Sequence, residues 1–249
     1  MDFELSKVFA VWLREVKRFT NSKARMVGSL GMPLLFLIAL GGGIGALVPG
    51  FNYQEFILPG IIGMTLLFNS MFSGVSIIWD RELGYLKEML VAPVNRLTIV
   101  FGRALGGATT SVIQGIIVLI LGILLGFASP SLSGFLLAIP VMVLFSTVIV
   151  LIGISFASVI QEVETFQLIM NLVIMPLFFL SNALFPLDKM PAWLRDFSLF
   201  NPVSYGVDAL RTLINGAGSM PFALDIALLV VLLFVMLGIA GFLFNKTSI

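Results

Sequence analysis

Side chains that could carry out chemistry are few in this sequence, and most of them lie outside its apolar segments. The chain contains no histidine and no cysteine, so common zinc ligands and the commonest general base are absent. No glycine-rich loop ending in Gly-Lys-Ser or Gly-Lys-Thr is present to bind nucleotide phosphates. Asp225 is the only aspartate near the interior of an apolar segment. We therefore expect no catalytic residue, no metal site and no cofactor bound by this chain.

The apolar segments carry only neutral polar side chains in their interiors. The candidates for lining a transport pathway are Asn69, Ser73, Gln114, Asn171 and Asn182. Carriers driven by protons or sodium usually place ionisable residues at the midplane of the membrane. This sequence offers none there, so a protein of this kind that moves a substrate uphill must receive its energy from a partner subunit.

A dense group of charges lies at residues 79–96, which read WDRELGYLKEMLVAPVNR. Residues 80–90 are predicted to form a helix of about three turns with leucines along one face. Pro93 would end this helix. A short, rigid helix between two membrane segments is suited to receive a push from a soluble motor. A loop helix that is merely solvated is the alternative interpretation.

The second long loop covers residues 186–221. Asn201 and Pro202 are typical of the N-cap and first position of a helix, and Asn215-Gly216 is typical of its end. The predicted apolar face consists of Val203, Val207, Leu210 and Ile214; Asp208 and Arg211 can pair on the polar side, and Trp193 and Tyr205 suit a membrane interface. We predict two short amphipathic helices in the outer leaflet, forming a lid over an exit. An inert connector is the alternative.

The composition places the whole chain in a membrane. Hydrophobic residues make up 59% of the 249 and charged residues 11%, whereas a soluble domain has about a quarter of its residues charged. Six segments without charges near their centres are predicted to span the bilayer: 26–48, 56–78, 104–127, 132–160, 166–185 and 222–244. The predicted fold is therefore all-α, with a single transmembrane domain over residues 1–249.

Residues 1–25 are predicted to form an amphipathic helix. Its apolar and basic positions separate onto two faces, which favours a place in the headgroup layer, with packing against other protein as the alternative. Eleven of the 14 lysines and arginines lie before the first span, within 79–103 or at Lys246. Positive residues concentrate in cytoplasmic loops, so both termini are expected in the cytoplasm of a multi-pass plasma-membrane protein.

Two stretches resemble the permease subunits of ABC-2 type transporters, a group that includes daunorubicin-resistance and polysaccharide exporters. The family's cytoplasmic loop reads approximately (D/E)RExGTLExLLVxPVxR, and Tyr85 and Met89 are the departures from it here. The matching positions are Asp80, Arg81, Glu82, Gly84, Leu86, Glu88, Leu90, Val91, Pro93, Val94 and Arg96. Residues 180–194, with Pro186 and Trp193, and residues 201–211 are similar to the family's LSGxxFPxxxLPxWL and NPLTYxVDxLR, with Asn182 replacing a glycine.

The resemblance implies an exporter permease that works as a homodimer, or as a pair of similar permeases, with two ATPase subunits that hold ATP and Mg. Residues 79–97 would then be a coupling helix in a cleft of the ATPase, and the N-terminal helix would flank the entrance as a gate. The implied coupling residues are Asp80, Arg81, Glu82, Gly84, Tyr85, Leu86, Glu88, Leu90, Pro93 and Arg96. The substrate would be an amphipathic or lipid-linked drug, lipid or glycan, and nucleic acid has no part. An ion-coupled carrier without an ATPase and a non-transporting scaffold are the alternatives.

Overall fold

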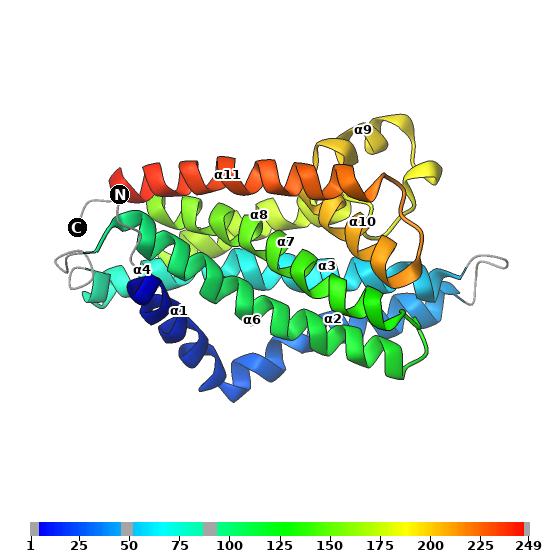
Figure 1. Ribbon diagram of the computed structural model, residues 1–249, viewed down its shortest axis with the longest axis horizontal. Coiled ribbons are helices and arrows are strands. Elements are labelled where there is room, and N and C mark those ends of the chain that lie inside the picture. The colour runs from blue at the N-terminus through cyan, green and yellow to red at the C-terminus, as the bar shows by residue number, and fades with distance from the viewer. Residues whose placement is uncertain (1–4, 46–51, 87–93, 247–249) are drawn as a thin grey trace.

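The computed structural model describes residues 5–45, 52–86 and 94–246, and every regular element in these ranges is helical. The long helices lie side by side along the longest axis of the molecule (Figure 1). They are α2 (Lys23–Gly45), α3 (Tyr53–Ser73) with its continuation α4 (Val75–Glu82), α6 (Arg96–Leu124), α7 (Leu132–Val159), α8 (Val163–Phe179) and α11 (Phe222–Lys246). The all-helical class predicted from the sequence is confirmed for the described residues.

Five stretches of helix among the described residues are long and apolar enough to cross a bilayer: Met26–Gly43, Tyr53–Glu82, Arg96–Leu124, Leu132–Val159 and Phe222–Lys246. The remaining predicted span corresponds to α8, which has 17 residues. At 1.5 Å per residue it is about 26 Å long, slightly short of the ~30 Å hydrocarbon core. The outer surfaces of the bundle suit lipid, since Phe234 and Leu35 are 68% and 60% exposed.

The bundle has two distinct ends. Figure 1 shows the described chain ends, Leu5 and Lys246, at the end where α1 (Leu5–Thr20) and α4 lie, which we call the α1 end. The opposite end carries the 3₁₀ turn Leu187–Lys189, α9 (Ala192–Phe200) and α10 (Pro202–Asn215), and we call it the α10 end. The two long loops singled out in the sequence therefore lie at opposite ends of the bundle.

The core is centred on α3, most of whose residues are buried against α2, α6, α7 and α10. Glycine permits the closest of these approaches. A Cβ atom on Gly74 would lie 2.6 Å from the backbone carbonyl of Gly153, and one on Gly60 would lie 2.1 Å from the carbonyl oxygen of Ala183. Real Cβ atoms do not come so near, so α3 and α4 pack backbone to backbone against α7 and the loop after α8.

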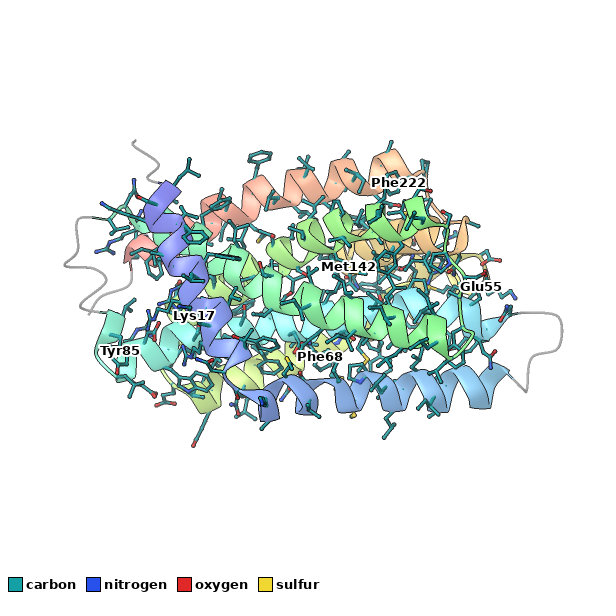
Figure 2. All side chains as sticks on the ribbon, turned by 60° about the horizontal axis from the view of Figure 1, so that its bottom comes forward. Lys17, Glu55, Phe68, Tyr85, Met142 and Phe222 are labelled. Atoms are coloured by element: carbon teal, nitrogen blue, oxygen red, sulfur yellow. The ribbon has the colours of Figure 1, made fainter. Side chains whose placement is uncertain are left out.

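The N-terminal helix α1 lies across α6 at a steep angle (Figures 1 and 2). Cβ atoms on Gly102 and Gly106 of α6 would meet Val11 and Glu15 of α1 at 2.8 and 2.5 Å, so these glycines form a flat surface for α1. The opposite side of α1 exposes Leu5 and Phe9. One face of the amphipathic helix therefore packs on protein, as the alternative interpretation held, and the other remains open.

Candidate functional site

A buried carboxylate organises the α1 end. Asp80, in the last turn of α4, is 1% exposed. Its Oδ1 accepts a hydrogen bond from Arg14 Nη2 at 2.9 Å and lies 3.7 Å from Arg18 Nη1, both on α1. Its Oδ2 accepts from Arg103 Nη2 of α6 at 2.5 Å. Together with Glu15, which approaches Arg103, these residues form what we call the Asp80 cluster.

Arg103 is the most deeply buried cation of this cluster, with 3% of its surface exposed. In addition to Asp80, it lies 3.7 Å from Glu15 Oε1 and donates to the hydroxyl of Ser76 at 3.3 Å. A buried ion pair gives little net stability, but removing one partner leaves an uncompensated charge and is strongly destabilising. The cluster therefore fixes the relative positions of α1, α4 and α6.

Aromatic contacts strengthen the attachment of α1. Trp12 Nε1 donates to Thr109 Oγ1 at 3.0 Å. The guanidinium of Arg18 lies 5.1 Å from the centre of the Trp79 ring, and that of Arg14 lies 5.8 Å from the Tyr85 ring. Cations above aromatic rings are attracted by the ring quadrupole. Figure 2 shows Tyr85 at the extremity of this end, with Lys17 on α1 nearby.

The predicted single helix over residues 80–90 is wrong. Helix α4 ends at Glu82, and Gly84 follows with φ +79°. Its backbone N–H donates to the carbonyl of Arg81 at 3.2 Å. Glycine adopts this left-handed conformation without penalty and ends helices for that reason. A helical turn begins again at Tyr85 and Leu86, while Glu88, Leu90 and Pro93 lie outside the described residues.

The remaining residues of the expected coupling set divide into two groups. Arg81 donates to the carbonyls of Ile160 and Ala157 at the end of α7 at 3.0 and 3.3 Å, and Arg96 donates to two carbonyls at the end of α11. They satisfy helix-end carbonyls that have no partner in their own helix. Leu86 is buried, whereas Glu82 and Tyr85 are exposed. The exposed members are thus available to a partner at this end.

Three of the five neutral polar candidates come together. Asn69 and Ser73 of α3 and Gln114 of α6 line one cavity of about 190 Å³ beneath α1. Asn171 is instead on the exposed face of α8. Asn182 is buried at the α10 end, where its side chain donates to Asp208, and it belongs to a different cluster from Gln114.

A second buried carboxylate organises the α10 end. Asp208 of α10 is fully buried, and its oxygens accept from the side chains of Arg211 and Asn182 at 3.4 and 3.1 Å. They also accept from the backbone N–H groups of Ser219 and Met220 at 2.8–3.0 Å. The Asp208–Arg211 pair predicted from the spacing therefore forms, but inside the protein. Through these partners Asp208 connects α10 with the loop that follows α8 and with the segment that leads into α11.

Arg211 is held from three sides. Its Nη2 donates to the carbonyl of Asn182 at 2.9 Å, and its guanidinium lies 4.1 Å from the centre of the Phe56 ring. Burial lowers the pKa of Arg211 to about 10, against the opposing charge and hydrogen bond of Asp208. The side chain therefore remains protonated at neutral pH.

The expected lid helix has the predicted ends and the predicted buried face. The side chain of Asn201 accepts from Val203 N at 2.9 Å, Pro202 is in the first turn, and Gly216 ends α10 with φ +77°. Val203, Val207, Leu210 and Ile214 are buried. They pack on α3, α7 and α11, whereas this face was expected from the sequence to be buried in the outer leaflet. A Cβ on Gly63 would lie 2.4 Å from Val207.

The outer part of the expected lid is more open. Trp193 on α9 is 62% exposed and Phe200 is 88% exposed, while Pro186 and Tyr205 are partly buried. The hydroxyl of Tyr205 donates to the carbonyl of Leu199, which joins α10 to α9. Figure 1 shows α9 projecting from the α10 end beside α11. An exposed tryptophan on such a helix suits a membrane interface.

Sequence reasoning missed Arg14, Glu15, Arg18 and Arg103 as members of the Asp80 cluster, in which Glu15 pairs with Arg103 and the three arginines pair with Asp80. The first three belong to the charged face of an amphipathic helix that was expected to face headgroups, and Arg103 marked only the edge of a span. The backbone donors after α10 were missed as well, because no side-chain pattern reports a backbone hydrogen bond.

These features define a multi-pass helical membrane protein with a buried charge cluster at each end of its bundle. A family model for ABC-2 type transporters matches residues 6–215. The chain is 31% identical over 224 residues to a protein of Cyanophora paradoxa named as transport permease ycf38, covering 85% of this chain and 75% of that protein. The chain therefore belongs to the ABC-2 type transporter family.

Bacterial relatives cover similar extents. Nodulation protein J of Rhizobium leguminosarum bv. viciae is 26% identical over 213 residues, which are 83% of this chain and 82% of that protein. The inner membrane transport permease YadH of Escherichia coli K12 is 26% identical over 227 residues, which are 89% of this chain and 88% of that protein. The family's permeases are membrane subunits, in agreement with the expectation that this chain is not itself an enzyme.

Proposed function

We propose that this chain is the permease subunit of an ATP-driven exporter that moves an amphipathic or lipid-linked molecule out of the cytoplasm. Two copies of a separate ATPase bind ATP and Mg and act on two copies of this chain. The family match over residues 6–215 carries this proposal. The Asp80 cluster supports it, because it places the segment that would meet a motor in direct mechanical contact with α1 and α6.

The proposed coupling path begins after Gly84. Glu82 and Tyr85 are exposed at the α1 end, where an ATPase in the cytoplasm would dock. A displacement of the segment after Gly84 would move α4, and Asp80 would transmit it to Arg14 and Arg18 on α1. Helix α1 is thereby suited to act as a gate at the cytoplasmic entrance.

The proposed pathway runs between two copies of the chain. Asn171 is exposed within the otherwise apolar stretch 168–179 of α8, and lipid offers such an amide no hydrogen bond. A facing copy or an aqueous pathway would satisfy it. The drug, lipid and glycan classes of substrate remain open at this stage.

An ion-coupled carrier is the second candidate, and a non-transporting scaffold is the third. Asp80, Arg103, Asp208 and Arg211 are the buried charges that form ion pairs among the described residues, and they lie at the two ends of the bundle. A midplane relay of ionisable residues is what the carrier would require. A scaffold would need neither the exposed Glu82 and Tyr85 nor the cavity beneath α1.

The proposed topology has six crossings, with α8 as the fifth, and with α9 and α10 entering the outer leaflet between the last two. Both termini lie in the cytoplasm.

Cysteine labelling tests this topology. Because the native chain has no cysteine, single cysteines report accessibility without background. We expect Ser22→Cys and Asn245→Cys to be shielded from an impermeant thiol reagent added outside intact cells, and Ser133→Cys and Ala217→Cys to react. All four sites are at least partly exposed in the structure. Labelling of Ser22→Cys from outside would show that the orientation is the opposite of the proposed one.

Motor coupling is tested by Glu88→Lys. We expect this reversal of charge to lower ATP-driven transport by about tenfold or more in vesicles reconstituted with the ATPase that co-purifies with the tagged chain, because one lost charged contact at an interface is worth roughly 1.5–3 kcal/mol. Folding should be unchanged. Glu164→Lys, an exposed glutamate in the first turn of α8, is the matched control and should transport normally. Full transport by Glu88→Lys would exclude this coupling role. Transport driven by an ion gradient without ATP would favour the carrier instead.

A further inference from the structure

The cavity of about 190 Å³ beneath α1 is lined by residues of five helices. Helix α1 covers it with Glu15, Arg18 and Phe19, α2 contributes Ser29, and α3 with α4 and α6 form the remaining walls. It therefore lies between the proposed gate helix and the bundle. Nothing in the packing of the core requires such a polar space, since the glycines nearby bring the same helices into direct contact.

The polar wall of this cavity presents acceptors. The hydroxyls of Ser29, Ser73 and Thr110 each donate to a carbonyl of their own helix, at 3.2, 2.7 and 2.9 Å. Their hydrogens are thereby occupied, and their oxygen lone pairs remain for other groups. One of the two N–H groups of the Asn69 amide likewise donates to the carbonyl of Thr65 at 2.8 Å, and its carbonyl oxygen is an acceptor.

Gln114 supplies the observation that points to a ligand. Its side-chain nitrogen donates to Ser29 Oγ, while its Oε1 is buried, lies in a residue with 0% exposure, and has no hydrogen-bond partner. A buried acceptor without a partner has lost its hydrogen bonds to water and gained none in return. A ligand that donates hydrogen bonds would remove this penalty and match the rest of the wall.

The charges and rings of the lining restrict the ligand further. Glu15 and Arg18 contribute one charge of each sign, and Arg18 is engaged with Asp80 and the Trp79 ring. A cationic head would lie beside Arg18, and an anionic head would face Glu15 and a wall rich in acceptors. Phe19, Phe72 and Trp79 provide flat apolar surfaces beside the polar wall. Rings next to neutral acceptors fit an uncharged group with several hydroxyls.

We propose that this cavity binds the uncharged, hydroxyl-rich head of an amphiphile, with Gln114 Oε1 and Thr110 Oγ1 as acceptors and Trp79 against the head. The proposal rests on the proposed export function for its biological meaning, and it narrows the substrate class to polyol-headed amphiphiles. The head group can come from a sugar or from glycerol, and its apolar chain would leave the cavity toward the lipid.

Binding is measured without ATP, by the fluorescence of Trp79 in a chain that carries Trp12→Phe and Trp193→Phe, in phosphatidylcholine nanodiscs. Decyl β-glucoside and monodecanoylglycerol are the two uncharged probes, and the response to each distinguishes a sugar source from a glycerol source. Decyl sulfate and decyltrimethylammonium carry the same chain with a charged head. We expect a saturable response to at least one uncharged probe and at least about tenfold weaker binding of both charged probes.

Two residues with neighbouring hydroxyls, Thr110 and Ser111, provide the matched variants. Thr110 and Ser111 both donate to the carbonyl of Gly107 at 2.9 Å, but only Thr110 lines the cavity. Thr110→Val and Gln114→Leu should weaken binding of the uncharged probe about five- to tenfold, as expected for one lost hydrogen bond, and Ser111→Ala should not. No saturable response, preference for a charged probe, or equal effects of Thr110→Val and Ser111→Ala would each overturn the proposal. This readout needs no transport, so its failure is distinct from failure of the export function.

Discussion

Asp80→Asn is expected to lower the free energy of unfolding by about 3–5 kcal/mol, because it leaves Arg103 buried beside a neutral side chain. The amide keeps the shape of the carboxylate but lacks its charge, and its nitrogen would face arginine donors. Chemical denaturation of the purified protein in mixed detergent micelles measures this change. Transport should fall as well, because α1 loses its ionic attachment to α4.

Two controls separate the effect of losing the buried charge from the effect of changing a residue at this place in α4. Glu82→Gln changes an exposed carboxylate two residues further along the same helix and should stay within about 0.5 kcal/mol of the native protein. The double variant Asp80→Leu with Arg103→Met removes both buried charges and should regain most of the lost stability. If that double variant regains stability but not transport, the cluster serves coupling. If Asp80→Asn lowers the free energy of unfolding by no more than Glu82→Gln does, the cluster does not hold α1 in place.

Local signals in the sequence predicted the parts of the structure that depend on neighbouring residues. Asn201, Pro202 and Gly216 define both ends of α10 through caps that act within a few residues, and the spacing of Val203 and Val207 gave its buried face. The long helices were recognisable because a charged side chain inside the bilayer is costly whatever the fold, so long segments without charges mark the spans.

The errors arose from one local signal that was outweighed and from contacts with segments distant in sequence. Gly84 was included in a helix because the amphipathic pattern continued across it, although glycine readily takes the left-handed conformation that stops a helix. Asp80 was expected to face a partner, and only the fold reveals that Arg14 and Arg103, 66 and 23 residues away in sequence, surround it. The surroundings of α10 were likewise unpredictable, since its apolar face fits helices as well as lipid.

The two ends of the bundle share one physical device. At each end a buried aspartate on one helix gathers donors from segments that are distant in sequence: Asp80 joins α1, α4 and α6, and Asp208 joins the loop after α8, α10 and the start of α11. A charged group in a low-dielectric setting accepts only a narrow set of geometries. Each cluster therefore holds its own set of segments in a fixed relation to one another.

Asp208→Asn is expected to lower the free energy of unfolding by about 3 kcal/mol or more. An asparagine has one acceptor oxygen, and its amide nitrogen would be directed at the N–H groups of Ser219 and Met220 or at Arg211, all of which are donors. Arg211 would keep its bond to the Asn182 carbonyl and its place over Phe56, but its charge would lose the counter-ion. Chemical denaturation in mixed micelles measures the loss. Increased thiol labelling of Ala217→Cys in the Asp208→Asn background would show that the segment before α11 has come loose.

Asp225→Asn is the matched control at the same end. Asp225 is also fully buried and lies in the first turn of α11, but neither of its carboxylate oxygens has a hydrogen-bond partner. Replacing it removes no hydrogen bond and relieves any repulsion from Asp208, so stability should be unchanged or higher. The contrast between two buried aspartates isolates the contribution of the partners from that of burial. Equal losses in Asp208→Asn and Asp225→Asn would mean that the network around Asp208 does not hold α10 to the bundle, and the Asp208–Arg211 pair would then be a consequence of the packing of α10 and not its cause.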